Sequence, residues 1–172
     1  MYRFLTFTYA VLMFCIANMG KSKADVFNTF SYKALPSLCV GGNQGIASPF
    51  AGTSNGWILV GGGCNFPDTP VAQGGLKKFY AEIYGTKAEH PDGWRLLGHL
   101  NTPVAYGASV SVGNDLVWIG GNDGHQSLTD VTLLQSTSGG LKQQPLPPLP
   151  IALDNMAATY ANGYIYVAGG QN

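Results

Sequence analysis

This sequence has little charge. Only 10% of its 172 residues are Asp, Glu, Lys or Arg, and the formal net charge is zero. No run of Lys and Arg occurs outside the extreme N-terminus, so there is no electrostatic basis for binding nucleic acid. The sequence also has no readable phosphate-binding loop, no Ser/His/Asp arrangement, and no metal-ligand spacing among His90, His99 and His125. We therefore expect no nucleic-acid partner, no metal and no other cofactor.

Cysteine is also scarce, with three residues in the whole chain. Cys15 lies in the apolar N-terminal run, in a context that does not suit a lipoprotein. Cys39 and Cys64 can form a disulfide if the protein is exported, because export favours oxidation. The alternative is that both are small, buried side chains, and the sequence leaves this open.

Long apolar runs are absent except at the N-terminus. Arg3 precedes a run over 4–19 that carries no charge, and Ser22-Lys23-Ala24 has small residues where a signal peptidase reads them. We interpret residues 1–24 as a secretory signal cleaved after Ala24, which predicts a periplasmic or secreted protein without a membrane attachment. The alternative is a membrane anchor, but the run is short for a span of about 20 residues.

Glycine, in contrast, is abundant, at 24 residues, and it follows a repeated pattern. An apolar stretch runs into a glycine pair three times, at 57–63, 116–121 and 164–170. The spacing is 58 residues from Gly62 to Gly120 and 49 from Gly120 to Gly169. A period of about 50 residues with four strands is typical of a kelch blade in a β-propeller. Glycine is needed where a Cβ would collide with the neighbouring blade or forbid the backbone angle.

Each repeat is predicted to consist of a strand, a tight turn, a second strand and the glycine pair, with two further strands in the first two repeats. The expected strands of the first repeat are 46–53, 57–60, 79–84 and 93–97. Those of the second are 105–112, 116–119, 130–134 and a weak one near 140–144. Those of the third are 155–160 and 164–167. Asn55-Gly56 and Asn162-Gly163 predict two-residue hairpin turns.

The predicted fold is therefore all-β, a partial kelch-type propeller of about two and a half four-stranded blades. We expect the signal peptide over 1–24, a connecting segment over 25–44, and the partial propeller over 45–172. Its blades are expected at 45–101 and 102–147, with a half-blade at 148–172. The alternative is a β-sandwich with coincidental glycines. Because propellers have about four to eight blades, we expect either a fragment of a longer protein, which we favour, or a second chain that completes the ring.

The sequence resembles a known family at Gly62-Gly63-Cys64-Asn65-Phe66-Pro67-Asp68-Thr69-Pro70 and Gly74-Gly75-Leu76-Lys77-Lys78-Phe79-Tyr80. The likeness continues at Ala105-Tyr106-Gly107, Ile119-Gly120-Gly121 and Leu153-Asp154-Asn155-Met156-Ala157, and covers roughly residues 35–172. These motifs resemble the exported kelch proteins related to N-acetylneuraminate epimerase, a sialic acid mutarotase. The order of the blades is most similar to the cyclically permuted branch.

The resemblance implies a six-bladed propeller that interconverts the anomers of N-acetylneuraminate or a related sugar. In this reaction a base deprotonates the anomeric hydroxyl, an acid protonates the ring oxygen, and the ring opens and recloses. The family's proposed base is a Glu in a Gly-Glu-x-x-Pro-Gly-x-Arg segment. Glu82 and Glu89 are the only glutamates in this chain, and neither has that context. We therefore predict no catalytic residue and no activity for the chain alone. The alternatives are a non-catalytic kelch module that binds glycans or proteins, and a remnant that does not fold.

The predicted substrate-binding residues lie where blade loops would meet a sugar of the sialic acid class. Lys78 is the favoured partner for the substrate carboxylate, and Tyr80 is a candidate for stacking on a sugar. For each residue, solvation or packing is the alternative role. The full set is Asn65, Asp68, Lys77, Lys78, Tyr80, Tyr106, Asn122, Asp154 and Asn155.

Overall fold

The computed structural model describes residues 32–39 and 45–172. The chain divides into two units, 1–34 and 35–172, and the strands of the described residues all lie in the second. The predicted signal peptide lies outside the described residues, as does most of the predicted connecting segment. Among the residues that are described, no helix has the length and apolar character needed to cross a membrane.

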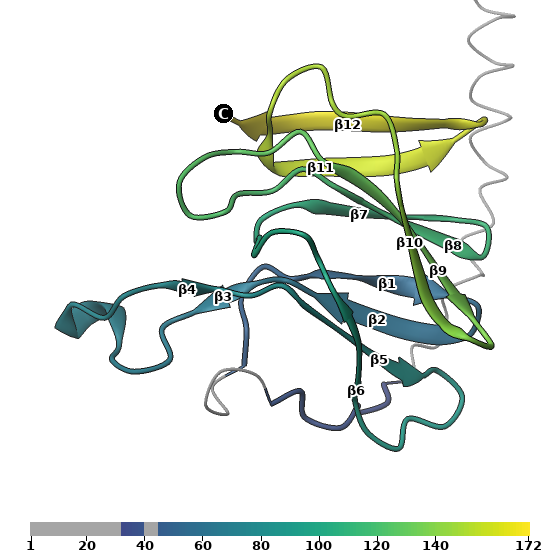
Figure 1. Cartoon of the computed structure of the whole chain (residues 1–172), viewed down its shortest axis with the longest axis horizontal. Helices are drawn as coiled ribbons and strands as arrows, with labels where there is room; N and C mark the ends of the chain where they lie inside the picture. The colour runs from purple at the N-terminus through teal and green to yellow at the C-terminus, as the bar shows by residue number, and fades with distance from the viewer. Residues whose placement is uncertain (1–31, 40–44) are drawn as a thin grey trace, which may run out of the picture. The chain divides into compact units, whose positions relative to one another are not determined.

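The first blade is an antiparallel four-stranded sheet in the order β1-β2-β5-β6. Its strands are β1 (Phe50–Ser54), β2 (Trp57–Gly61), β5 (Glu82–Lys87) and β6 (Arg95–His99). A small hairpin of β3 (Cys64–Asn65) and β4 (Lys78–Phe79) is inserted between β2 and β5, and it carries the short 3-10 helix η2 (Val71–Gln73). Figure 1 shows this insertion projecting from one end of the blade.

The second blade repeats this order, and a third hairpin packs beside it. The second blade contains β7 (Ala108–Val112), β8 (Asp115–Ile119), β9 (Val131–Thr137) and β10 (Gly140–Pro145). The hairpin consists of β11 (Asp154–Ala161) and β12 (Tyr164–Gln171). The three sheets are stacked face to face (Figure 1), so the chain has the all-β, kelch-propeller architecture that the repeats predict.

The first strand of each of the first two blades begins later in the sequence than predicted, because of the backbone conformation just before it. The first strand starts at Phe50 rather than residue 46, and the fifth expected strand starts at Ala108 rather than residue 105. Ser48 and Tyr106 have φ angles of 51° and 65°, outside the extended region, and each blade strand begins two residues later. The expected strand over 79–84 is also wrong, because Phe79 belongs to β4 and the blade strand begins only at Glu82.

The turn and glycine predictions are confirmed. Asn55 and Gly56 both have positive φ, at 46° and 74°, as a two-residue hairpin turn of this type requires. Gly62 has a φ of 64°, and a Cβ there would lie 2.3 Å from the carbonyl oxygen of Val104 in the next blade. A Cβ on Gly120 would likewise lie 2.5 Å from the carbonyl oxygen of Leu153. The glycine pairs therefore mark where the backbone of one blade touches the next.

Two apolar clusters hold the blades together. Between the first two blades, the rings of Phe50 and Trp118 stack with centroids 5.0 Å apart, and Leu59, Leu116 and Leu134 are fully buried around them. The second cluster lies between the second blade and the hairpin, and its buried members are Ala108, Val110, Val117, Ile119 and Met156. Cys39 and Cys64 are both free thiols, the first exposed and the second buried, so the possible disulfide does not form.

Candidate functional site

Three left-handed residues mark where the three sheets meet at one end. Ser48, Tyr106 and Asn155 have φ angles of 51°, 65° and 54°. They occupy equivalent positions in the three repeats. In each repeat, the residue two positions later pairs with the residue that directly precedes the glycine pair. The N–H of Tyr106 donates to the carbonyl of Ser48 at 3.1 Å, and the N–H of Asn155 donates to the carbonyl of Tyr106 at 2.8 Å. These positions therefore form a hydrogen-bonded series from blade to blade. Left-handed residues other than glycine are enriched at functional sites.

A polar hollow of about 470 Å³ opens beside this series. Five of the nine predicted binding residues line it, and they come from the β3–β4 insertion, the second blade and the β11–β12 hairpin. Its full lining is Lys77, Phe79, Tyr106, Asn122, Asp123, Gly124, His125, Asp154, Asn155 and Gln171. Sequence reasoning missed Phe79, Asp123, Gly124 and Gln171 as lining residues.

Asp154 organises one wall of the polar hollow. The residue is 2% exposed, and its carboxylate accepts hydrogen bonds from Asn122 Nδ2 at 2.9 Å and Ser127 Oγ at 2.8 Å. The side-chain amide of Asn155 donates to its other oxygen. Burial would raise the pKa of Asp154, but the hydrogen bonds from Asn122, Ser127, Asn155 and Gln171 together lower it below its usual value. The group is therefore an ionised carboxylate at neutral pH, held by neutral donors.

The loop after β8 is rigidified by its own side chains. Asn122 Oδ1 accepts from the backbone N–H of Gly124 at 2.7 Å, and Asp123 Oδ1 accepts from those of His125 and Gln126 at 2.8 and 2.9 Å. The backbone hydrogen bond from Gln126, followed by that from His125, lowers the pKa of Asp123. This loop therefore presents fixed polar groups to the hollow.

Lys77 and Tyr106 form the opposite side. Lys77 Nζ donates to the Tyr106 hydroxyl at 2.9 Å, and the buried thiol of Cys64 lies 3.4 Å from the same oxygen. The hydrogen bond to Tyr106 raises the pKa of Lys77, outweighing the opposing effect of its slight burial. The lysine is therefore an ammonium throughout the neutral range.

A second hollow, of about 540 Å³, shares Lys77 and Tyr106 with the first and is mainly apolar. It is lined by Gly45, Ile46, Ala47, Cys64, Asn65, Phe66, Pro70, Val71, Lys77 and Tyr106. Asn65 is fixed there, because its amide donates to the carbonyl of Gly45 at 2.8 Å and its oxygen accepts from Tyr80 Oη at 2.7 Å.

Three predicted binding residues line neither hollow. Lys78 lies over the ring of Tyr80 at 5.3 Å from its centroid, and Tyr80 is itself 4% exposed. Asp68 is exposed on the projecting loop. Their contact with a sugar stays a prediction. Within residues 32–39 and 45–172, no group of three His, Cys, Asp or Glu side chains is arranged to hold a metal ion.

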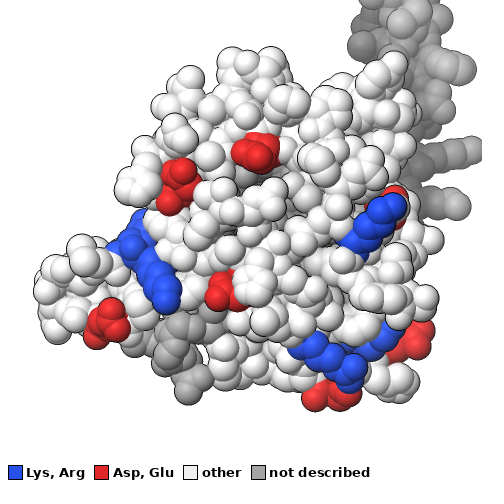
Figure 2. Space-filling view, in the orientation of Figure 1, with Lys and Arg blue, Asp and Glu red and all other residues white. Residues whose placement is uncertain are grey.

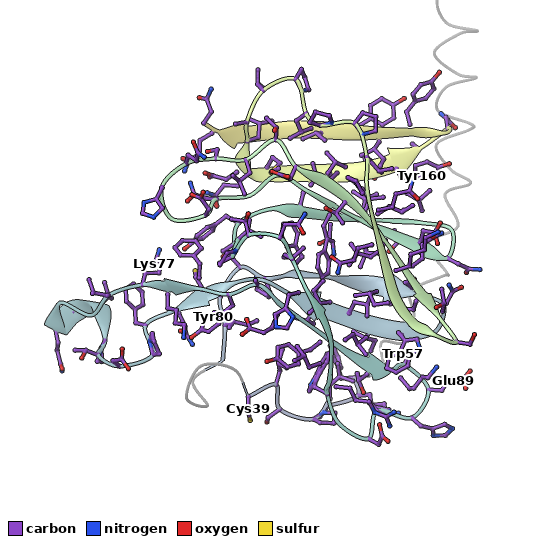
Figure 3. The ribbon with its side chains drawn as sticks, viewed as in Figure 1. Cys39, Trp57, Lys77, Tyr80, Glu89 and Tyr160 are labelled. Atoms are coloured by element: carbon purple, nitrogen blue, oxygen red, sulfur yellow. The ribbon has the colours of Figure 1, made fainter. Side chains whose placement is uncertain are left out.

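The polar hollow can therefore hydrogen-bond a ligand rich in hydroxyl groups. It offers amides, one buried carboxylate and one ammonium. Neither glutamate lines it, and Figure 3 places Glu89 at the end of the first blade near Trp57, away from Lys77. Charged side chains are few and scattered on the face in Figure 2, where they form no continuous basic surface.

Comparison with known proteins gives a consistent result. The family model for N-acetylneuraminate epimerase matches residues 17–142. The N-acetylneuraminate epimerase of Salmonella enteritidis PT4 is 34% identical over 108 residues, covering 57% of this chain and 27% of the relative. That of Haemophilus influenzae is 39% identical over 122 residues, covering 66% and 32%. The chain thus spans about a quarter to a third of the length of these relatives.

A solved structure supports the same likeness. The structure of YjhT superposes with a TM-score of 0.58 and 26% sequence identity, over 69% of this chain and 36% of that one. The similarity therefore extends from sequence motifs to the arrangement of the blades.

Proposed function

The chain belongs to the N-acetylneuraminate epimerase family, and on that premise we propose that it supplies part of the sugar-binding face of an exported mutarotase. The substrate of that enzyme is N-acetylneuraminate or a related sugar. The observation that carries the proposal is the polar hollow, where side chains from the insertion of the first blade, the second blade and the third hairpin line one space.

Anomer exchange needs little from the protein beyond positioning and proton transfer. The amides of Asn122 and Asn155 can bind sugar hydroxyls, while the ionised Asp154 keeps Asn122 and Asn155 in place. Because its pKa is lowered, Asp154 is a weak base and suits this positioning role better than proton abstraction.

We further propose that this chain is a portion of the enzyme and does not catalyse alone. The support is twofold. The chain spans about a third or less of its epimerase relatives. Residues 1–172 also contain no Gly-Glu-x-x-Pro-Gly-x-Arg segment. A reading frame downstream of codon 172 that encodes this segment would support the proposal, and its absence would favour a glycan- or protein-binding module instead.

The proposal is tested by NMR on the purified chain with N-acetylneuraminate. We expect saturation transfer from protein to sugar, with anomer exchange at the uncatalysed rate. Asn155→Gly should weaken binding at least about fivefold, since a hydrogen bond contributes about 1 kcal/mol.

Asn162→Gly is the matched control. It replaces another left-handed asparagine, with φ of 51°, at the opposite end of the same hairpin. Binding should be unchanged in this variant. Exchange above the uncatalysed rate would contradict the proposed inactivity, and the absence of any saturation transfer would contradict sugar binding.

A further inference from the structure

Lys77 and Tyr106 are the two residues that line both hollows. A ligand bound beside them can therefore be contacted from either hollow. Their hydrogen-bonding groups are therefore candidates for ligand contact.

The ammonium of Lys77 is held in place without a carboxylate. It lies 5.2 Å from the ring centroid of Tyr106 and 5.7 Å from that of Phe66, and it donates to the Tyr106 hydroxyl. Among residues 32–39 and 45–172, no ion pair joins Lys77 to a carboxylate. An ammonium has three N–H donors, and two remain for a ligand after Tyr106 has taken one.

Tyr106 is fixed even more firmly. Its N–H and C=O groups are both hydrogen-bonded to the neighbouring sheets, and its left-handed backbone sets the direction of the ring. The phenolic oxygen receives the hydrogen bond from Lys77 and faces the thiol of Cys64. Since the oxygen acts as an acceptor towards Lys77, its own O–H is free to donate to a ligand.

Other charged groups near the site are already engaged. Lys78 lies over Tyr80, outside both hollows. The carboxylates of Asp154 and Asp123 accept hydrogen bonds from their own neighbours. Lys77 is therefore the one Lys or Arg side chain that lines these two hollows, and among the described residues it forms no ion pair.

We propose that Lys77 Nζ and the Tyr106 hydroxyl together bind the carboxylate of a sugar acid. A carboxylate oxygen between them would accept a charge-assisted N–H bond from one and an O–H bond from the other. This inference rests on the proposed function, and it assigns the carboxylate to Lys77 rather than to Lys78, the residue that the sequence alone favours.

The test compares N-acetylneuraminate with its methyl ester, which differs in lacking the carboxylate charge. Both are titrated into the full chain by NMR. We expect the acid to bind at least about tenfold more tightly, and Lys77→Met to abolish this preference. Tyr106→Phe should reduce it severalfold, while Lys77→Arg, which keeps the charge, should retain most of it.

Lys87→Met is the matched control, because Lys87 also lies over an aromatic ring, 4.3 Å from that of Trp57, at the other end of the first blade (Figure 3). Thermal unfolding of each variant separates binding from folding. Equal binding of acid and ester by the unmodified chain would overturn the assignment and leave the proposed function intact. A preference lost in Lys78→Met but kept in Lys77→Met would overturn it as well. No binding of either form would contradict both proposals.

Discussion

The second blade and the β11–β12 hairpin carry the same repeat in different surroundings. Val117 on β8 is 2% exposed, whereas Tyr166, at the same register position on β12, is 52% exposed. A Cβ on Gly120 would lie 2.5 Å from the next backbone, whereas one on Gly169 would meet nothing within 4 Å. The same position of the repeat is therefore buried only where another sheet packs against it. This agrees with repeat proteins in general, in which each repeat is stabilised by contacts with its immediate neighbours.

The largest expected contrast is between Trp118→Ala and Tyr166→Ala. Trp118 is buried between the first two blades, so its truncation should lower the free energy of unfolding by about 3–5 kcal/mol. Tyr166→Ala should change it by less than about 1 kcal/mol, because that ring is half exposed. Urea denaturation measures both. Similar losses in the two variants would show that the hairpin is buried in solution.

A narrower test compares Gly62→Ala with Gly169→Ala. Both glycines are left-handed, at 64° and 71°, so each variant should lose about 1–2 kcal/mol to backbone strain. Gly62→Ala should lose roughly 1–3 kcal/mol more, because its Cβ collides with the carbonyl of Val104. The difference between the urea denaturation midpoints of the two variants measures the contribution of the contact between Gly62 and the second blade. Equal midpoints would contradict such a contribution.

The smallest expected effect concerns pH. Asp154 joins the hairpin to the loop after β8 through polar contacts, whereas the Phe50–Trp118 stack between the first two blades has no ionisable group. Because the pKa of Asp154 is lowered in the folded state, its stabilising effect is complete above its ordinary pKa. The effect is lost as the pH falls through the lowered value.

Asp154→Asn should therefore cost about 2 kcal/mol at pH 7, and the gap to the unmodified chain should close at low pH. Denaturation at several pH values, with Asp115→Asn as a control in the turn region of β8, measures this. A gap independent of pH would mean that the charge of Asp154 contributes nothing to stability.

Much of the fold could be predicted because it follows from local signals. Asn55-Gly56 and the glycine pairs predict turns and blade contacts from the backbone angles that glycine permits. The starts of β1 and β7 could not be predicted, because nothing local shows that Ser48 and Tyr106 are left-handed. That conformation is imposed by hydrogen bonds between sheets that lie far apart in sequence.

The site was only partly predictable for a similar reason. Asn122 directly follows a glycine pair, and Asp154 and Asn155 lie at the start of the third repeat. Aligning the repeats therefore predicts that these residues lie at the same end of the sheets, where they line the polar hollow. Lys77 and Lys78 are adjacent in sequence, and only the geometry of the β3–β4 insertion separates their surroundings. Ser48 could have been found by aligning it with Tyr106 and Asn155, once the blade register was known.

The series formed by Ser48, Tyr106 and Asn155 separates recognition from folding. Each residue is tied to the next sheet through main-chain N–H and C=O groups, so the hydrogen bonds make no demand on the side chain. Among the residue types that tolerate a positive φ, the side chain at each of these positions can therefore change without loss of the hydrogen bonds that join the sheets.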